Sequence, residues 1–340
     1  MRPQKPSILA RCLQEFFTEY LPGIRGMSPH TQKSYRDSLV LLLRFLCSRT
    51  NLHPTALDLE NVTAEAVISF LNHLEEERHN CVQTRNVRLA AVHAFLSHVG
   101  SRYPEKSQQI HPILAIPLKR GGPQKPIDYL EDAELAALFS SIDRSSLKGR
   151  RDHTLFALMF NTGARVQEAL DLRPCDLQLA RPFQVRLVGK GRKERICPLW
   201  LQTAGLLKDL LAERGLESRS QDRLFVNCRG EPLSRFGVRH ILSRYIQAAE
   251  RSSPTLSQKR IHPHSLRHSA AMNLLSSGED LYSISQWLGH ASMNTTGKYA
   301  SLDLEMKRRA LSCVKPKGSY SYSQTKWRRD PNILLWLESL

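Results

Sequence analysis

Residues 262–268 of the chain read His-Pro-His-Ser-Leu-Arg-His. The proline can occupy the first turn of a helix, where its missing N–H has no intrahelical partner to lose. His264 and Arg267 then lie three residues apart on one helical face. An imidazole beside a guanidinium at the positive end of a helix forms an anion pocket, although a buried, hydrogen-bonded histidine is the alternative explanation. The stretch therefore indicates a helical domain with an anion site at one helix start.

Two further segments place a cation or a nucleophile next to a helix-ending glycine. Residues 161–168 read Asn-Thr-Gly-Ala-Arg-Val-Gln-Glu, so one helix ends at the glycine and the next presents Arg165 and Glu168 on one face. Later in the chain, an apolar helix ends at a Leu-Gly pair, and His290 and Tyr299 follow it. Taken singly, the first pair is explained as a surface ion pair and the tyrosine as packing.

The residues between these segments predict more helix and one hairpin. We expect helices at 128–139 and 151–160, and the alternating stretch 183–199 with a Gly-Lys-Gly centre predicts a β-hairpin. Lys190 lies at the tip of that hairpin, where the glycines allow close approach to a groove. Lys193 is a rival for any specific role, and a solubilising tip is the ordinary explanation. The second domain is therefore expected to be mainly helical with a small sheet.

The composition indicates a polyanionic partner. Lys and Arg number 49 against 32 Asp and Glu, a formal net charge of +17, for which nucleic acid is the leading partner and non-specific basicity the alternative. The seven cysteines are odd in number and never form a C-x-x-C pair, which argues against a disulfide framework or a zinc cluster. Neither an export signal nor a membrane-spanning apolar run is evident. We expect a cytoplasmic protein with no membrane association.

Residues 1–103 are expected to form an all-helical domain. Cap signals at Ser28 and Thr63 open segments with apolar residues at helical spacing, and a third such segment covers 87–95. The stretch 104–126 is rich in proline, glycine and basic residues and indicates a linker. Outward-facing cations near helix starts and in the linker can meet phosphates. The expected DNA contacts are Lys33, Arg36, Arg85, Arg88, Lys119, Arg120 and, in the hairpin, Lys193.

Taken in order, these segments resemble the catalytic domain of the tyrosine recombinases, the phage integrases and Xer-type resolvases. That family shows T-G-x-R-x-x-E, G-K-G-x-K-x-R, H-x-L-R-H and L-G-H before a tyrosine, and all four occur here in that order. The resemblance implies a mainly α fold with a small antiparallel β-sheet, preceded by an all-α core-binding domain. The implied divisions are 1–103 for the core-binding domain, 104–126 for the linker, 127–314 for the catalytic domain and 315–340 for a tail.

The resemblance also assigns the chemistry. It implies a DNA recombinase that works through a 3′-phosphotyrosyl intermediate, so neither a nucleotide cofactor nor a metal is expected. The implied catalytic residues are Arg165, Lys190, His264, Arg267, His290 and Tyr299, with Glu168 as an acidic companion. Guanidiniums suit the charge that builds on the non-bridging oxygens. Tyr299 is the implied nucleophile, His264 the expected proton acceptor, and Lys190 the expected donor to the leaving 5′ oxygen. Tyr299 is followed by Ala-Ser rather than the Thr-His or Ala-Arg that the family often shows, which leaves the subgroup open.

The tail 315–340 ends in an amphipathic segment, 330–340, in which Ile333, Trp336 and Leu340 fall on one helical face. This segment packs on its own domain or, as the resemblance suggests, on a neighbouring copy in a tetramer on two DNA duplexes. Related recombinases are further partners that the resemblance allows. A type IB topoisomerase and a DNA-binding architectural protein remain the alternative functions. The DNA site and the biological role, whether integration, transposition or resolution, stay open.

Overall fold

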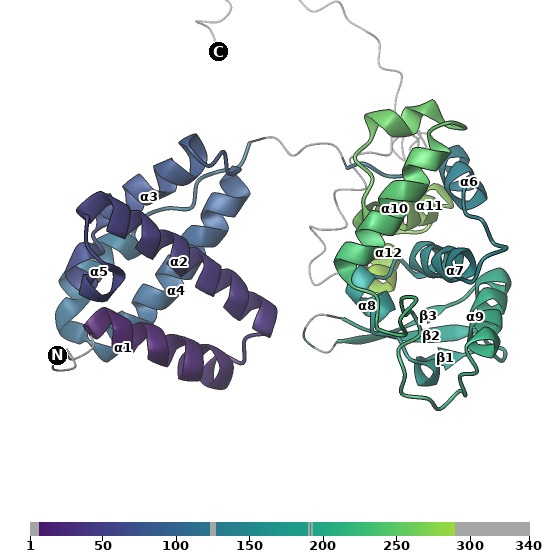
Figure 1. The fold of residues 1–340 in the computed structure, drawn as a ribbon, viewed down its shortest axis with the longest axis horizontal. Helices are drawn as coiled ribbons and strands as arrows, with labels where there is room; N and C mark the ends of the chain where they lie inside the picture. The colour runs from purple at the N-terminus through teal and green to yellow at the C-terminus, as the bar shows by residue number, and fades with distance from the viewer. Residues whose placement is uncertain (1–6, 123–126, 190, 192, 290–340) are drawn as a thin grey trace, which may run out of the picture. The chain divides into compact units, whose positions relative to one another are not determined.

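The structure of the protein is a computed structural model. The residues that it describes are 7–122, 127–189, 191 and 193–289. The chain divides into two compact units, Met1–Lys125 and Pro126–Leu340 (Figure 1). Each unit has its own hydrophobic core. Lys190, His290 and Tyr299 lie outside the described residues, as does the tail.

The first unit is helical throughout its described part. Its helices are α1 (Ile8–Glu15), α2 (Pro29–Thr50), α3 (Ala64–Glu76), α4 (Val82–Arg102) and α5 (Ser107–Leu114), and a wider helical segment, Phe16–Ile24, continues α1. The predicted caps are confirmed, because the Ser28 hydroxyl accepts from the Thr31 N–H at 3.3 Å and the Thr63 hydroxyl from the Ala66 N–H at 3.1 Å. The apolar faces of these helices form a single core.

The segment predicted as a linker is partly helical. Residues 104–114, which the sequence assigned to the 104–126 linker, form a short 3-10 turn and then α5. Ile110 and Ile113 of α5 are buried in the core of the first unit. Their burial offsets the backbone hydrogen bond that Pro112 forgoes inside the helix. The prolines hid this apolar spacing in the sequence.

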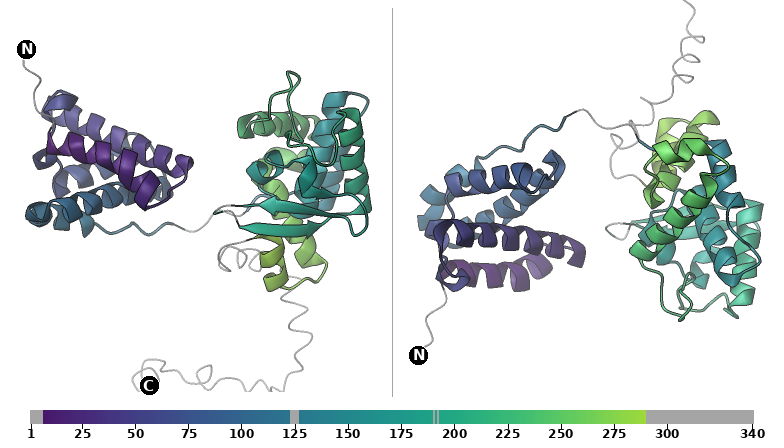
Figure 2. Two further views of the ribbon diagram at one scale, coloured as in Figure 1. Left: turned by 90° about the horizontal axis from the view of Figure 1, so that it is seen from below. Right: turned by 45° about the horizontal axis from the view of Figure 1, so that its top comes forward.

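The second unit combines helices with one small sheet. Its helices are α6 (Asp132–Ser140), α7 (Leu147–Thr162), α8 (Val166–Leu170), α9 (Leu201–Glu213), α10 (Arg235–Ala249), α11 (Pro263–Ser276) and α12 (Leu281–Leu288). Its strands are β1 (Leu177–Gln178), β2 (Gln184–Val188) and β3 (Glu194–Pro198). They form one antiparallel sheet in the order β1-β2-β3, which lies against the helical body (Figure 2). The expected fold class, mainly α with a small antiparallel sheet, is confirmed.

The structure confirms one sequence expectation for this unit and corrects another. The predicted hairpin is confirmed as β2 and β3, with Val188 paired to Glu194 at its outer end. The predicted helix at 128–139 begins later, at Asp132. Its first residues are instead extended, because the Leu130 N–H donates to the Ser269 hydroxyl of α11 at 2.8 Å.

The last described helix is held by a small cluster of its own. Ile284 and Leu288 of α12 pack with Ala271, Met272 and Leu275 of α11, apart from the main core of the unit. This contact fixes the end of α12, after which His290 and Tyr299 follow in the sequence. None of the described helices is long and apolar enough to cross a membrane.

Candidate active site

The end of α12 packs against the turn between α7 and α8. Gly163 ends α7 in the left-handed conformation with a φ of +60°, and a Cβ on it would lie 2.3 Å from Cδ2 of Leu288 in α12. Glycine is therefore required by the backbone conformation and by the close packing together. Arg165 follows as the N-cap residue of α8, so the helix break predicted at Thr-Gly is confirmed.

Glu168 is the buried acid of this turn, with its side chain 4% exposed. Its Oε1 accepts from Nη1 of Arg165 at 2.7 Å, and its Oε2 accepts from the Arg165 backbone N–H at 2.9 Å. Nη2 of Arg195 donates to the same Oε2 at 2.7 Å. Burial by itself would raise the pKa of Glu168, but the hydrogen bond and charge of Arg195, followed by the bonds from Arg165, outweigh it and hold that pKa below its ordinary value. The carboxylate is thus an ionised bridge between two arginines.

Arg195, the last arginine of the G-K-G-x-K-x-R motif, is a residue of the site for which no role was predicted from the sequence. Its side chain is 11% exposed, and its Nε donates to the backbone carbonyl of Trp287 in α12 at 3.1 Å. A usable signal was present, because side chains alternate along a strand and Arg195 has the same facing as the buried Cys197. An arginine on the inward face of a strand needs an acidic partner, and Glu168 is that partner.

Arg267 lies deepest in the site, at 1% exposure. Its Nη1 donates to the Gly163 carbonyl and its Nη2 to the Leu288 carbonyl, both at 2.7 Å. These two carbonyls end α7 and α12, and a cation is favourable at the negative end of a helix. Arg267 therefore ties α11 to the ends of both helices.

His264 lies one turn before Arg267, at the start of α11. Its ring stands edge-on to the ring of His268 with centroids 4.9 Å apart, and the ring of His262 lies 6.4 Å away. Desolvation of the imidazole by the surrounding protein lowers its pKa to about 4, and the charges of Arg267, His262 and Arg165 act in the same direction. The residue as a whole still has a face open to solvent. The imidazole is therefore neutral at pH 7.

Gly189 and Gly289, which directly precede Lys190 and His290 in the sequence, are among the described residues. The Gly189 N–H donates to the Lys193 carbonyl at 2.8 Å, one residue beyond Val188 of β2. A Cβ on Gly189 would lie 3.1 Å from Oε1 of Glu168. Gly289, directly before His290, lies under the Arg195 side chain, and its carbonyl is 3.5 Å from Nη2 of Arg165. Gly189 therefore lies beside the Glu168 carboxylate, and Gly289 lies beside the two arginines that pair with it.

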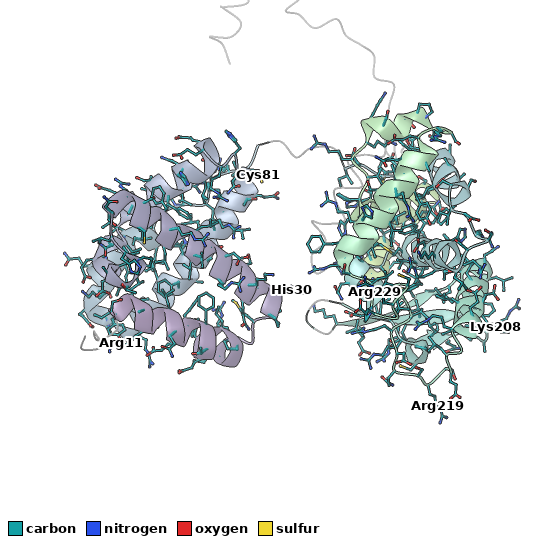
Figure 3. The ribbon with its side chains drawn as sticks, viewed as in Figure 1. Arg11, His30, Cys81, Lys208, Arg219 and Arg229 are labelled. Carbon is teal, nitrogen blue, oxygen red and sulfur yellow. The ribbon has the colours of Figure 1, made fainter. Side chains whose placement is uncertain are left out.

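The predicted DNA contacts of the first unit fall into two groups. Lys33, Arg36, Lys119 and Arg120 are exposed, as is Lys193 of the second unit. Arg85 and Arg88 are instead partly buried: the Arg85 side chain is 11% exposed, and Nη1 of Arg88 donates to the Ser38 hydroxyl of α2 at 3.0 Å. Elsewhere, basic side chains such as Arg11, Lys208, Arg219 and Arg229 extend from the surfaces of the units (Figure 3).

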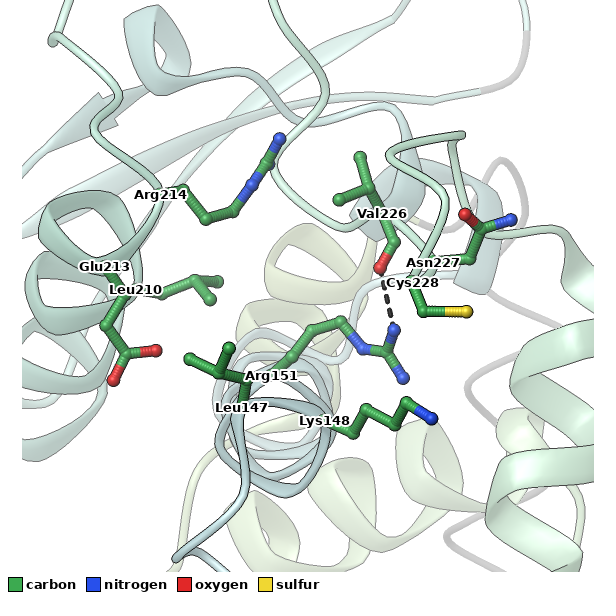
Figure 4. Close-up of a pocket in the computed structure, with 9 residues that line it drawn as sticks. All are labelled: Leu147, Lys148, Arg151, Leu210, Glu213, Arg214, Val226, Asn227 and Cys228. Atoms are coloured by element: carbon green, nitrogen blue, oxygen red, sulfur yellow. Dashed lines mark hydrogen bonds between the residues drawn. The ribbon is translucent and has the colours of Figure 1, made fainter.

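A separate cavity of about 330 Å³ lies at the other end of α7 (Figure 4). Lys148, Arg151, Arg214 and Cys228 are among its lining residues, and Nη1 of Arg151 donates to the Val226 carbonyl at 2.7 Å. The length of α7 places this cavity about 24 Å from Gly163, at 1.5 Å per residue. Arg165, Glu168, His264 and Arg267, which are the described residues predicted for the site, do not line it, so the cavity is distinct from the cluster around Glu168.

Comparison with known proteins covers both units. Residues 128–306 match the phage integrase family, and residues 14–99 match the phage integrase N-terminal SAM-like domain. The chain is 39% identical over 336 residues to y4rC of Sinorhizobium fredii, which is named as an integrase/recombinase, with 99% of each chain covered. It is 28% identical over 307 residues to the tyrosine recombinase XerC of Staphylococcus aureus, covering 90% of this chain and 97% of that one. A crystal structure of the XerH site-specific recombinase bound to a palindromic difH substrate, a post-cleavage complex, is similar with a TM-score of 0.67 and 25% identity over 89% of this chain and 87% of that one.

Proposed function

The chain belongs to the phage integrase family of tyrosine recombinases, and we propose that it cuts and rejoins double-stranded DNA with Tyr299 as the nucleophile. A bond from the tyrosine oxygen to phosphorus forms as the bond from phosphorus to the 5′ oxygen breaks. The products are a 3′-phosphotyrosyl link and a 5′-hydroxyl, and attack by the hydroxyl of another strand reverses the step. The observation that carries the proposal is the convergence of α8, β3, α11 and the end of α12 on one cationic cluster.

The two arginines of the catalytic set have different roles in this proposal. The Arg165 side chain is 36% exposed while Glu168 fixes one edge of it, so it can meet a non-bridging oxygen of the phosphate directly. Arg267 is buried on two carbonyls and contributes its positive charge through a medium that screens poorly. Together they offset the negative charge of the pentacoordinate phosphorus.

Proton transfer is assigned to the remaining groups. His264, with a pKa of about 4, is neutral at pH 7 in the DNA-free protein. A bound phosphate raises this pKa by favouring the cation, so the imidazole can then accept the proton of the tyrosine hydroxyl. We assign the protonation of the leaving 5′ oxygen to Lys190 and a hydrogen bond to the phosphate to His290. These roles come from the position of the two residues in the sequence motifs and from the placement of their neighbours Gly189 and Gly289.

A nicked suicide duplex tests the proposal. Cleavage next to the nick releases a short fragment and traps the covalent adduct, so the wild-type protein should become attached to DNA, and should do so in EDTA because no metal is expected. Tyr299→Phe keeps the ring and loses the nucleophilic oxygen, so it should bind the duplex and form no adduct. A persistent adduct on this variant would contradict the assignment. A wild-type protein that binds without forming adducts would indicate an architectural role.

We further propose that four copies assemble on two DNA duplexes, with residues 330–340 of one copy docked on the next. The amphipathic sequence around Trp336 and the family resemblance support this. Deleting residues 330–340 should leave single-site binding intact and impair the pairing of sites and strand exchange. Normal recombination by the truncated protein would contradict it. Since the substrate is cellular DNA, we place the protein at the nucleoid.

A further inference from the structure

Arg195 joins three parts of the second unit that are distant in sequence. It stands on β3, its Nη2 donates to Glu168 of α8 at 2.7 Å, and its Nε donates to the Trp287 carbonyl of α12 at 3.1 Å. Both donors, Nε and Nη2, belong to one rigid planar guanidinium, so the two bonds together fix its orientation. The hairpin is therefore pinned at its base to both helices.

Two glycines show how tightly this joint is packed. A Cβ on Gly289 would lie 3.1 Å from Cδ of Arg195, and a Cβ on Gly189 would lie 3.1 Å from Oε1 of Glu168. Both distances are shorter than the ordinary van der Waals contacts of a Cβ atom, so the neighbouring side chains would have to move. One glycine immediately precedes Lys190 and the other immediately precedes His290. A shift of the joint would therefore move the starting points of both segments.

The Glu168–Arg195 pair differs from the other ion pairs of the sheet. Arg186 on β2 also pairs with two carboxylates, Asp176 at 2.7 Å and Glu194 at 3.3 Å, but its side chain is 46% exposed. An exposed pair of that kind contributes little. Arg195 and Glu168 are 11% and 4% exposed. The loss of Glu168 would leave the buried charge of Arg195 without its carboxylate, and the loss of Arg195 would remove one of the two arginines that pair with Glu168.

We propose that Arg195 is a positioning residue for strand transfer: it holds the β2–β3 hairpin against α8 and α12 so that Lys190 reaches the leaving 5′ oxygen. The inference rests on the proposed function and adds to it. Lysine is a poor replacement here, because its single ammonium nitrogen cannot occupy the two positions from which Nε and Nη2 donate to the Trp287 carbonyl and to Glu168. A misplacement of about 1 Å can cost about 100-fold in rate.

The test compares two leaving groups in single-turnover cleavage. One suicide duplex carries the ordinary 5′ oxygen, and the other carries sulfur at that position, which leaves without a proton. Arg195→Lys should slow cleavage of ordinary DNA by about 100-fold and recover most of that loss on the sulfur substrate. Lys190→Ala should show the same pattern. The double variant should be little slower than Lys190→Ala alone, because both changes remove one function.

Arg186→Lys is the matched control, since it makes the same change on the neighbouring strand and should leave both rates unaltered. Duplex binding and the thermal unfolding of each variant show whether it is folded. Equal losses for Arg195→Lys on the two substrates, or losses that multiply in the double variant, would overturn the positioning role. Failure of the proposed function has a different signature, namely no adduct from the wild-type protein on either substrate.

Discussion

The two units differ in what they bury. Among the described residues of the first unit, the buried side chains are apolar apart from Ser38 and His98. The second unit buries charged groups as well. The buried charged residues that the structure describes are Glu134, Asp152, Glu168 and Arg267, all of the second unit.

This difference teaches where function has shaped the fold. A buried charge is unfavourable unless it is paired and hydrogen-bonded. Glu134 and Asp152 each satisfy that condition outside the cluster around Glu168, through Lys259 and Arg151. Glu168 and Arg267 satisfy it at the junction of α7, α8, α11 and α12. The first unit is thus held by its apolar helix faces, and the second additionally depends on a charged joint at its centre.

The largest effect is expected from removing Arg267. Arg267→Ala leaves the Gly163 and Leu288 carbonyls without these donors, which should lower the free energy of unfolding by about 3 kcal/mol and slow cleavage by about 100-fold or more. Urea unfolding followed by tryptophan fluorescence reports on the second unit, because Trp200 and Trp287 lie in it and the sequence of the first unit, residues 1–125, contains no tryptophan.

Arg102→Ala is the matching change in the first unit, where Arg102 pairs with Glu15 on the surface at 3.0 Å. It should alter neither the tryptophan transition nor the cleavage rate. If Arg102→Ala changed the unfolding transition and the cleavage rate as much as Arg267→Ala does, the proposed difference between the units would be wrong.

Neutralising Glu168 should have the next largest effect. Its pKa is lowered in the folded state, so its contribution to stability is present above its unfolded pKa and is lost as the pH falls through the folded pKa. Glu168→Gln should therefore be less stable than the wild type at pH 7 by roughly 1–3 kcal/mol, and the difference should shrink in acid. A difference that grows as the pH falls would contradict the ionised bridge. Glu194→Gln, on the exposed pair of the hairpin, serves as the control.

A smaller effect is expected for His264, and it concerns only the protonation of the imidazole. Its imidazole should protonate with a midpoint near pH 4 in the DNA-free protein, as followed by NMR, with His264→Asn identifying its signal. Because the folded pKa lies below the unfolded value, this group reduces stability as the pH falls from the unfolded pKa toward about 4. A bound phosphate should raise the pKa by favouring the cation. A midpoint at the ordinary value of about 6.5 would remove the argument that the imidazole is kept neutral.

The smallest effects are expected on the surface of the first unit. Lys33 is exposed on α2, whereas Arg36 on the same helix pairs with Asp37 at 2.8 Å. Lys33→Ala should weaken duplex binding a few-fold and reduce the slope of log affinity against log salt by about 1. Arg36→Ala should weaken it less, because part of its charge is already offset. An unchanged salt slope for Lys33→Ala would remove Lys33 from the contacts.

Features set by local contacts could be predicted from the sequence, whereas those set by long-range contacts could not. Caps and apolar spacing predicted α2 and α3 because those features act locally, and alternation predicted the hairpin. The position of α5 was missed because its core contacts are long-range and Pro112 obscured its pattern. Arg165 and Glu168 were paired correctly because they lie one turn apart. Arg195 was not, because its partners lie 27 and 92 residues away in the chain.

The central claim is that Tyr299 becomes covalently joined to DNA, and peptide mapping tests it most directly. The trapped complex from a suicide duplex is digested with protease and nuclease, and mass spectrometry locates the tyrosine that retains a nucleotide. The account predicts the modification on Tyr299 alone, in the peptide that follows Lys298. A nucleotide on Tyr320 or Tyr322, or on a residue of the first unit, would contradict it.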